Sequence, residues 1–192
     1  MNHIQRSGFF LGLALALGTA GGVCAQTISA NAQITSTGSG PFNYTITLNN
    51  TAASTTNIQT FWFSWIPGED YLATSPTSVS PPTGWIDNIT HAGAGDGYAL
   101  QFFTFTSPLT PGHSLSFQFT SADTPTALAG NSIFYSSTPV GTSFVYSGLP
   151  ESGTSDEFVA QVVPEPSSLA LVGLGFVGIW LTGGCRRLFG RR

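Results

Sequence analysis

Apolar and polar residues alternate one for one along much of the stretch from 26 to 163. From 42 to 49, Phe, Tyr, Ile and Leu occupy every second position and Asn and Thr occupy the positions between them. The stretch from 114 to 120 repeats this pattern with Leu and Phe. A period of two places alternate side chains on opposite faces of a β-strand. The pattern therefore predicts strands that bury one face.

Turn residues divide this stretch into short segments. Further strands are expected at 28–35, 60–66, 84–90, 96–106, 132–136, 142–147 and 157–163. About eight or nine strands at this spacing, with no helix among them, predict an all-β fold, an antiparallel β-sandwich or jelly roll.

Three segments carry finer predictions. The segment from 60 to 66 is apolar on both faces, which indicates a central strand or one whose outer face is covered. The alternation changes phase at Phe102-Phe103, where a β-bulge would keep the apolar side inward. Prolines mark 67–70 and 74–84 as loops, and any binding site is expected there.

Charge is distributed unevenly along the chain. Between Gln26 and Val163 there is no Lys or Arg, and the net charge is about −8 with neutral histidines. The acidic residues there are Glu69, Asp70, Asp87, Asp96, Asp123, Glu151, Asp156 and Glu157. A domain without cations cannot neutralise phosphates, which excludes nucleic acid as a partner. Both cysteines, Cys24 and Cys185, lie outside this stretch, so it has no disulfide and no thiolate metal site.

The N-terminus has the features of a secretory signal peptide. Arg6 precedes an apolar run from 8 to 19, and Val23-Cys24-Ala25 precedes Gln26. The run is shorter than the roughly 20 residues that a membrane span needs. We therefore predict a signal peptide over 1–25, cut between Ala25 and Gln26. A lipoprotein signal at Cys24 is the alternative, but the residues before it lack the expected leucine.

The C-terminus combines three features in a fixed order. A polar, proline-containing motif occupies 163–168, an apolar segment that we expect to be a transmembrane helix occupies 169–184, and a basic tail occupies 185–192. The motif contains Val163, Pro164, Glu165 and Pro166, and the tail contains Arg186, Arg187, Arg191 and Arg192. The prolines keep the motif extended. The arginines hold the far end of the helix on the cytoplasmic side, which leaves residues 26–162 outside as an all-β extracellular domain.

This C-terminal stretch, with Pro164, Glu165 and Pro166 intact, resembles that of the PEP-CTERM family of Gram-negative exported proteins. The resemblance implies an exosortase as partner, an enzyme thought to cut near the motif and to release or transfer the protein. It also implies export through the inner membrane, a transient single-pass anchor, and a final place at the cell surface or in an extracellular matrix, often with exopolysaccharide or biofilm. An ordinary C-terminal membrane anchor is the alternative interpretation of the hydropathy alone.

Candidate catalytic residues are few, and we predict no enzyme, cofactor or metal. His91 and His113 are the histidines of the domain, and no nucleophile-elbow motif accompanies them. Glu69 or Asp70 could pair with Asp87 or Asp96 in a glycosidase, although solvated surface acids explain the same residues. Residues 87–88 and 93–97 could supply oxygen ligands to calcium, but they match no loop consensus and an Asp-Gly turn is the better explanation.

Tryptophans offer the main candidate for ligand binding. Trp62, Trp65 and Trp85, with Tyr71, could form a platform for sugar rings, although tryptophan is more often a core residue. Trp85 follows a proline-rich loop and is the candidate carbohydrate contact. The sequence therefore favours a structural or adhesive role in exopolysaccharide or biofilm, with a carbohydrate-binding module and a carboxylate-based glycosidase as alternatives.

Overall fold

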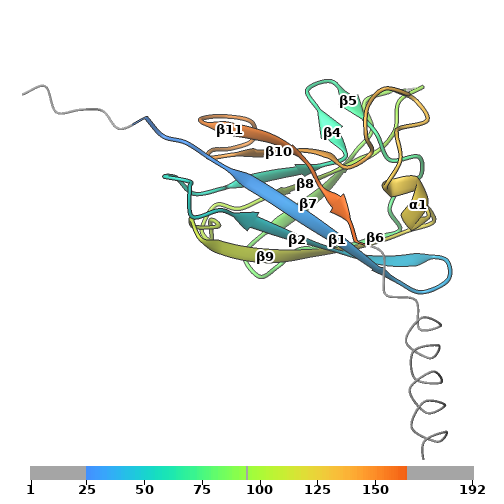
Figure 1. Cartoon of the computed structure of the whole chain (residues 1–192), viewed down its shortest axis with the longest axis horizontal. Helices are drawn as coiled ribbons and strands as arrows, with labels where there is room; N and C mark the ends of the chain where they lie inside the picture. Colours follow the sequence, from blue (N-terminus) through green and yellow to red (C-terminus); the bar gives the residue numbers. More distant parts are fainter. Residues whose placement is uncertain (1–24, 94, 164–192) are drawn as a thin grey trace, which may run out of the picture.

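Two five-stranded β-sheets form the body of the molecule (Figure 1). The computed structural model describes residues 25–93 and 95–163. The strands of the first sheet run in the order β12 (Gln161–Val162), β1 (Ala30–Thr37), β2 (Phe42–Asn50), β9 (His113–Ser121) and β6 (Ser78–Ser80). Those of the second run in the order β11 (Ser155–Val159), β10 (Thr142–Tyr146), β3 (Thr60–Phe63), β8 (Ala99–Phe103) and β7 (Ile86–Thr90).

All neighbouring strands within the two large sheets are antiparallel except β1 and β12, which are parallel. A separate antiparallel pair joins β4 (Trp65–Ile66) to β5 (Glu69–Asp70). The prediction of an all-β, mainly antiparallel domain is confirmed. The described residues contain twelve strands rather than eight or nine, because the predicted strands at 60–66 and 157–163 are each divided in two and the short strands β5 and β6 were not anticipated, whereas 132–136 is not a strand.

The first sheet follows the alternation in the sequence. Along β1 the burial alternates strictly, with Ala30, Ala32 and Ile34 inward and polar residues outward. Strands β2 and β9 run alongside with Ile46 opposite Phe117, and both side chains lie in the core. One face of this sheet is therefore apolar and the other is polar.

Aromatic rings from both sheets meet in the core. Phe61 of the second sheet lies 5.3 Å from Phe117 of the first, between ring centroids, and Phe63 lies 5.6 Å from Phe119. Phe102 also contacts Phe117, at 4.6 Å. Inward-facing rings that interdigitate in this way are typical of two sheets packed face to face.

The prediction for 60–66 is confirmed in its main point, because β3 is central in its sheet and buried on both faces. The segment is not one strand, however. Ser64, with φ of 62°, separates β3 from β4 and turns the chain out of the sheet. As a result Trp65 stacks on Trp62 at 4.1 Å and covers the outer face of β3.

Several finer predictions are wrong. No bulge interrupts β8, whose register with β3 is continuous from Leu100 to Phe103. Phe102 enters the core, whereas Phe103 contacts Phe105 on the outer face, so apolar residues occupy both faces without a bulge.

The segment 132–136 is not a strand, because its backbone hydrogen bonds form local turns. The Ser132 N–H donates to the Thr138 carbonyl oxygen, and the Thr138 N–H donates to that of Tyr135. The predicted loop 74–84 contains β6, an edge strand of three residues where flanking prolines are tolerated. The predicted loop 67–70 contains β5, which pairs with β4. A single helical turn, α1 (Pro125–Leu128), is capped by Thr124 and was not expected from the sequence.

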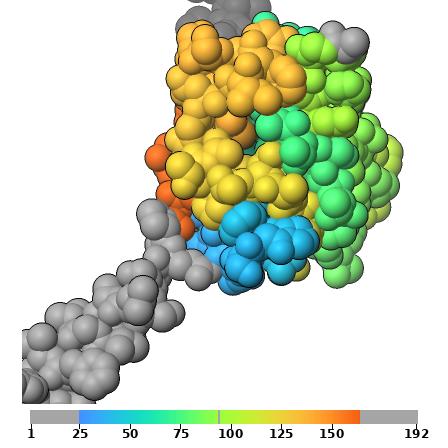
Figure 2. Space-filling model, turned by 90° about the vertical axis from the view of Figure 1, so that its right-hand side faces the viewer, coloured from blue at the N-terminus to red at the C-terminus, as the bar shows by residue number. Residues whose placement is uncertain are grey.

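The last described residues lie at the end of the molecule that carries the β1–β2 hairpin and α1, the end that faces the viewer in Figure 2. Because β12 is parallel to β1, it runs toward the hairpin. The β10–β11 turn lies at the opposite end (Figure 1). Within 25–93 and 95–163 we find no helix of the length and apolarity that crossing a membrane requires.

Candidate functional site

Two of the candidate catalytic acids, Asp70 and Asp96, accept hydrogen bonds from the backbone. The Asp96 carboxylate accepts hydrogen bonds from the backbone N–H of Asp70, at 3.0 Å, and of Gly97, at 2.9 Å. Asp70 in turn accepts from Ala92 at 3.1 Å and is only 1% exposed. Burial, and then the nearby Asp96 carboxylate, raises the pKa of Asp70. The structure thus brings Asp70 and Asp96 together, and one oxygen of each carboxylate accepts from backbone N–H groups.

The other proposed partners lie elsewhere or have a local role. Glu69 accepts a hydrogen bond from the Tyr71 hydroxyl at 2.9 Å. Asp87 lies on β7, opposite Phe102 in the register. Over the described ranges, no group of three or more His, Cys, Asp or Glu side chains is arranged to hold a metal ion. A turn ends at Asp96, whose N–H donates to the Gly93 carbonyl at 3.2 Å, and the Gly97 N–H donates to the Asp96 carboxylate.

The two histidines make separate local contacts. His91 stacks on Tyr98 with ring centroids 4.6 Å apart, and its Nδ1 lies 2.6 Å from the Gly97 carbonyl oxygen. His113 begins β9, where its Nδ1 lies 3.0 Å from the Thr110 hydroxyl. Each ring is thus engaged by residues near it in the sequence.

Trp85 is a core residue, and the exposure required for it to be a carbohydrate contact is absent. Its side chain is 5% exposed and meets Phe117 edge-on at 5.2 Å. Its indole N–H donates to the Ser107 carbonyl at 3.0 Å. It borders a hollow of about 260 Å³, but the ring face is covered. The other members of the proposed platform, Trp62, Trp65 and Tyr71, are also buried.

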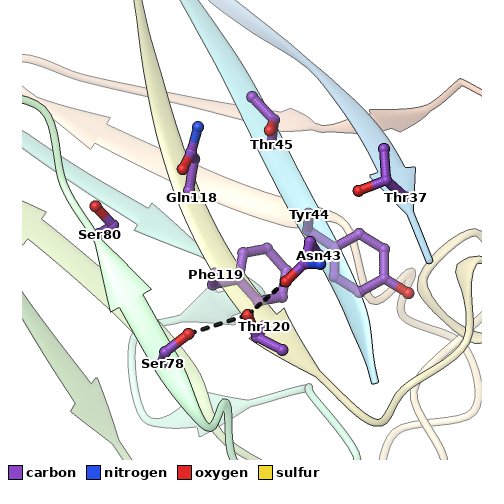
Figure 3. A pocket seen from close by; sticks show the side chains of 9 residues that line it. All are labelled: Thr37, Asn43, Tyr44, Thr45, Ser78, Ser80, Gln118, Phe119 and Thr120. Carbon is purple, nitrogen blue, oxygen red and sulfur yellow. Dashed lines mark hydrogen bonds between the residues drawn. The ribbon is translucent and has the colours of Figure 1, made fainter. Parts of the chain in front are cut away.

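A groove of about 410 Å³ crosses β2, β9 and β6 near the β1–β2 hairpin (Figure 3). We call it the neutral groove, because its lining has no charged side chain: it consists of Thr37, Asn43, Tyr44, Thr45, Ser78, Ser80, Gln118, Phe119 and Thr120. Ser78 donates to the Thr120 hydroxyl at 3.0 Å, and Thr120 donates to Asn43 at 2.9 Å. The rings of Tyr44 and Phe119 are buried and stack on each other at 4.9 Å.

The neutral groove is part of a larger uncharged surface on the first sheet. Every outward-facing residue of β1, β2, β9 and β6 is Ser, Thr, Asn or Gln: Asn31, Gln33, Thr35, Thr37, Asn43, Thr45, Thr47, Asn49, Ser78, Ser80, Ser114, Ser116, Gln118 and Thr120. Cross-strand hydrogen bonds link some of them, such as the bond of 2.8 Å from Asn49 to Asn31. We call this surface the neutral face.

The outer face of the second sheet is apolar around one cleft, in contrast to the polar neutral face. A cleft of about 300 Å³, which we call the aromatic cleft, is lined by Gln101, Phe103, Phe105, Leu149 and Pro150. Phe105 is 68% exposed and meets Phe103 edge-on, with ring centroids 5.7 Å apart. Sequence reasoning did not identify this cleft. The change of phase at 102–103 was the signal, because it places Phe103 on the outside.

Backbone hydrogen bonds join residues 160–163, the last described residues, to the rest of the domain. The Ala160 N–H donates to Gly141 at 2.8 Å, and β12 pairs with β1 at Gln33 and Ile34. The Val163 N–H then donates to the Ile34 carbonyl at 2.8 Å. The proposed sorting residues Pro164, Glu165 and Pro166, the apolar segment 169–184 and the four arginines lie outside the described residues, as do the signal peptide residues before Ala25.

A family model for the PEP-CTERM protein-sorting motif matches residues 162–187. The chain is a PEP-CTERM protein with an all-β domain. The resemblance found in the sequence is thereby confirmed, and the motif indicates export and membrane-anchored sorting in a Gram-negative bacterium. In this PEP-CTERM protein, the matched region begins inside β12, so the motif follows the folded domain without a linker.

Other comparisons add little about the β domain of this PEP-CTERM protein. No curated protein matches the chain. Among solved structures, it is similar to a GH20 exo-β-N-acetylglucosaminidase from Vibrio harveyi, seen as an inactive mutant and in complex with N-acetylglucosamine. The TM-score is 0.41 for both, and the identities are 13% and 14%. The match covers 70% of this chain but 18% of the enzyme, so the chain spans less than a fifth of that protein.

Proposed function

We propose that this chain is an exported protein that an exosortase sorts to the cell surface or the extracellular matrix, where its β domain has a structural or adhesive role without catalysis. The sorting motif at 162–187 carries the proposal. The predicted signal peptide would start export, and the apolar segment and arginines would hold the chain in the inner membrane until the exosortase acts.

The end of the fold favours one region for the cut. A processing enzyme needs an extended segment that it can bind, and backbone that is paired in a sheet must first be released from that pairing. Residues 160–163 are all held by backbone hydrogen bonds. We therefore propose that the exosortase cuts after Val163, within residues 164–168, and that the mature protein keeps β12.

The neutral face supports a structural or adhesive role. Hydroxyl and amide groups hold water and form hydrogen bonds without attracting counterions, so this surface is compatible with an uncharged hydrated polymer. The acidic residues of the described domain, with no Lys or Arg beside them, would repel other anionic chains. Asp70 and Asp96 are the candidate catalytic carboxylates that lie close together, and each accepts a hydrogen bond from a backbone N–H. The glycosidase alternative therefore has less support than the binding roles.

The test is fractionation of the producing bacterium with and without its exosortase. With the exosortase, the protein is expected in the surface polymer or the medium, without its basic tail. Without the exosortase, it is expected in the membrane fraction with the tail intact. An intact tail through Arg192 in the membrane of both strains would mean a plain single-span anchor.

Carbohydrate binding is a second candidate function, and the aromatic cleft favours it. Trp85 no longer supports it, because its ring is buried. Phe105, exposed beside Phe103, supplies the kind of apolar ring surface that sugars contact. Retention of the protein by its own exopolysaccharide, measured by co-sedimentation, would support this function, and absence of retention would count against it.

A further inference from the structure

The aromatic cleft combines apolar walls with one polar group at its base. Phe103 and Phe105 stand almost perpendicular to each other, at 88°, and Leu149 and Pro150 of the β10–β11 turn border the same cleft. Ile86, 47% exposed, lies opposite Phe103 in the register and extends the apolar surface. Apolar walls with few polar groups are the usual composition of a small-ligand site.

Gln101 is the polar group. It is 8% exposed, lines the cleft, and lies opposite Trp62 in the register of β8 and β3. Within the described part of the chain, no hydrogen bond joins its side-chain amide to another residue, and its amide atoms are not among the fully buried ones, so they remain in contact with solvent in the cleft. An amide that faces solvent from a largely buried side chain can exchange its hydrogen bonds to water for bonds to a ligand that supplies a donor and an acceptor.

We propose that the aromatic cleft binds a segment of a neutral polysaccharide. The apolar face of one sugar ring packs on Phe105 and Phe103, and a ring hydroxyl pairs with the Gln101 amide. This assignment rests on the extracellular location in the proposed function and specifies where the second candidate function would act.

Charge and size favour a neutral sugar over other occupants. The lining of the cleft carries no charge, and the described domain has carboxylates but no Lys or Arg to hold an anionic polymer. A volume of about 300 Å³ is at the lower end of small-ligand sites. A stable protein partner needs about 800 Å² of surface, and it would leave the Gln101 amide buried unless it placed a polar group into the cleft.

The position of the cleft is compatible with a ligand that is a long polymer. Leu149 and Pro150 lie in the β10–β11 turn, at the end of the molecule opposite to the end toward which β12 runs (Figure 1). A polymer bound there would lie away from Val163, the last described residue. Binding is therefore expected both before and after processing.

The test is isothermal titration calorimetry of the full chain, purified in a detergent without a sugar headgroup. The probes are cellohexaose, laminarihexaose, maltohexaose and mannohexaose, with hexagalacturonate as the anionic comparison. At least one neutral probe is expected to bind and the anionic probe is not. Phe105→Ala is expected to weaken binding about tenfold or more, equivalent to about 1.4 kcal/mol. Gln101→Met, which keeps the shape and removes the amide, is expected to weaken it similarly.

Ile133→Ala is the matched control, because Ile133 is another exposed apolar side chain, 74% exposed, and does not line the cleft. It is expected to leave binding unchanged, and thermal unfolding checks that each variant is folded. The proposal is overturned if no neutral probe binds or if Phe105→Ala binds as the unmodified chain does. It is also overturned if the unmodified chain sediments as a dimer that Phe105→Ala dissociates, because a second copy would then be the occupant of the cleft. Because binding is measured on purified protein, failure here leaves the sorting proposal intact, and failure of sorting leaves this result intact.

Discussion

The backbone N–H of Val163 donates a hydrogen bond of 2.8 Å to the carbonyl oxygen of Ile34, in the middle of β1. This bond extends the parallel pairing of β12 by one residue, and the next residue is the first proline of the sorting motif. The last described strand therefore ends directly before the prolines of the sorting motif. Without β12, part of the edge of β1 would be exposed, and exposed edges favour aggregation.

The first prediction concerns this hydrogen bond. Val163→Pro removes the N–H donor, and is expected to lower the free energy of unfolding by about 1 kcal/mol. It is also expected to let the exosortase cut upstream of 163 in a fraction of molecules, which mass spectrometry of the mature C-terminus would show. Val163→Ala keeps the N–H and should retain the original end. The same C-terminus in both variants would mean that the pairing of β12 does not limit the cut.

A second prediction concerns Ser64, which is fully buried with positive φ and has no hydrogen-bond partner for its hydroxyl within the described residues. Ser64→Gly relieves the backbone strain and removes the hydroxyl, and should raise the free energy of unfolding by about 1 kcal/mol or more. Ser64→Ala removes the hydroxyl only and should give a smaller gain. Urea denaturation measures both. A loss of stability in Ser64→Ala would indicate that the hydroxyl has a partner.

The third prediction concerns pH. The pKa of Asp70 is raised above its ordinary value of 3.8, by burial and then by Asp96, so the folded state favours the protonated form. The stability that Asp70 contributes is therefore present below the ordinary pKa, and is lost as pH rises through the raised pKa. Asp70→Asn stays neutral and can still accept from Ala92. The free energy of unfolding of Asp70→Asn, relative to that of the unmodified protein, should therefore rise as pH rises. Urea denaturation at a series of pH values measures it. The opposite trend would contradict the raised pKa.

The fourth prediction separates Trp85 from ligand binding. Trp85→Phe keeps an aromatic ring against Phe117 but loses the hydrogen bond to Ser107. It should lower the free energy of unfolding by about 1–3 kcal/mol. Retention by exopolysaccharide should not change in the folded variant, whereas Phe105→Ala should reduce it. Loss of retention in Trp85→Phe, with folding intact, would restore the earlier interpretation of Trp85.

Much of the fold was predictable in strands that bury one face, because such strands alternate apolar and polar residues along the sequence. Alternation identified β1, β2 and β9, and the two apolar faces of 60–66 identified a central strand. The short strands β6 and β12 were not predictable as separate elements, because two or three residues carry no period and form only against a neighbour that is distant in the sequence.

The candidate site was less predictable for the same reason. Trp85 and Phe105 both follow turn or loop segments, and nothing local shows that one enters the core while the other remains exposed. The stacking of Trp65 on Trp62 depends on the turn at Ser64, a conformation that serine adopts only in a favourable tertiary context. The sorting motif was identifiable because its prolines, apolar run and arginines are contiguous in sequence and need no tertiary context.

The most direct test of the central claim is the intact mass of the mature protein released by cells that have the exosortase. The account predicts a chain that begins at Gln26 and ends within 164–168, so that β12 and the Val163–Ile34 hydrogen bond are retained, and no such product from cells without the exosortase. A mature chain that ends before Ala160, or one that extends to Arg192 in both strains, would contradict it.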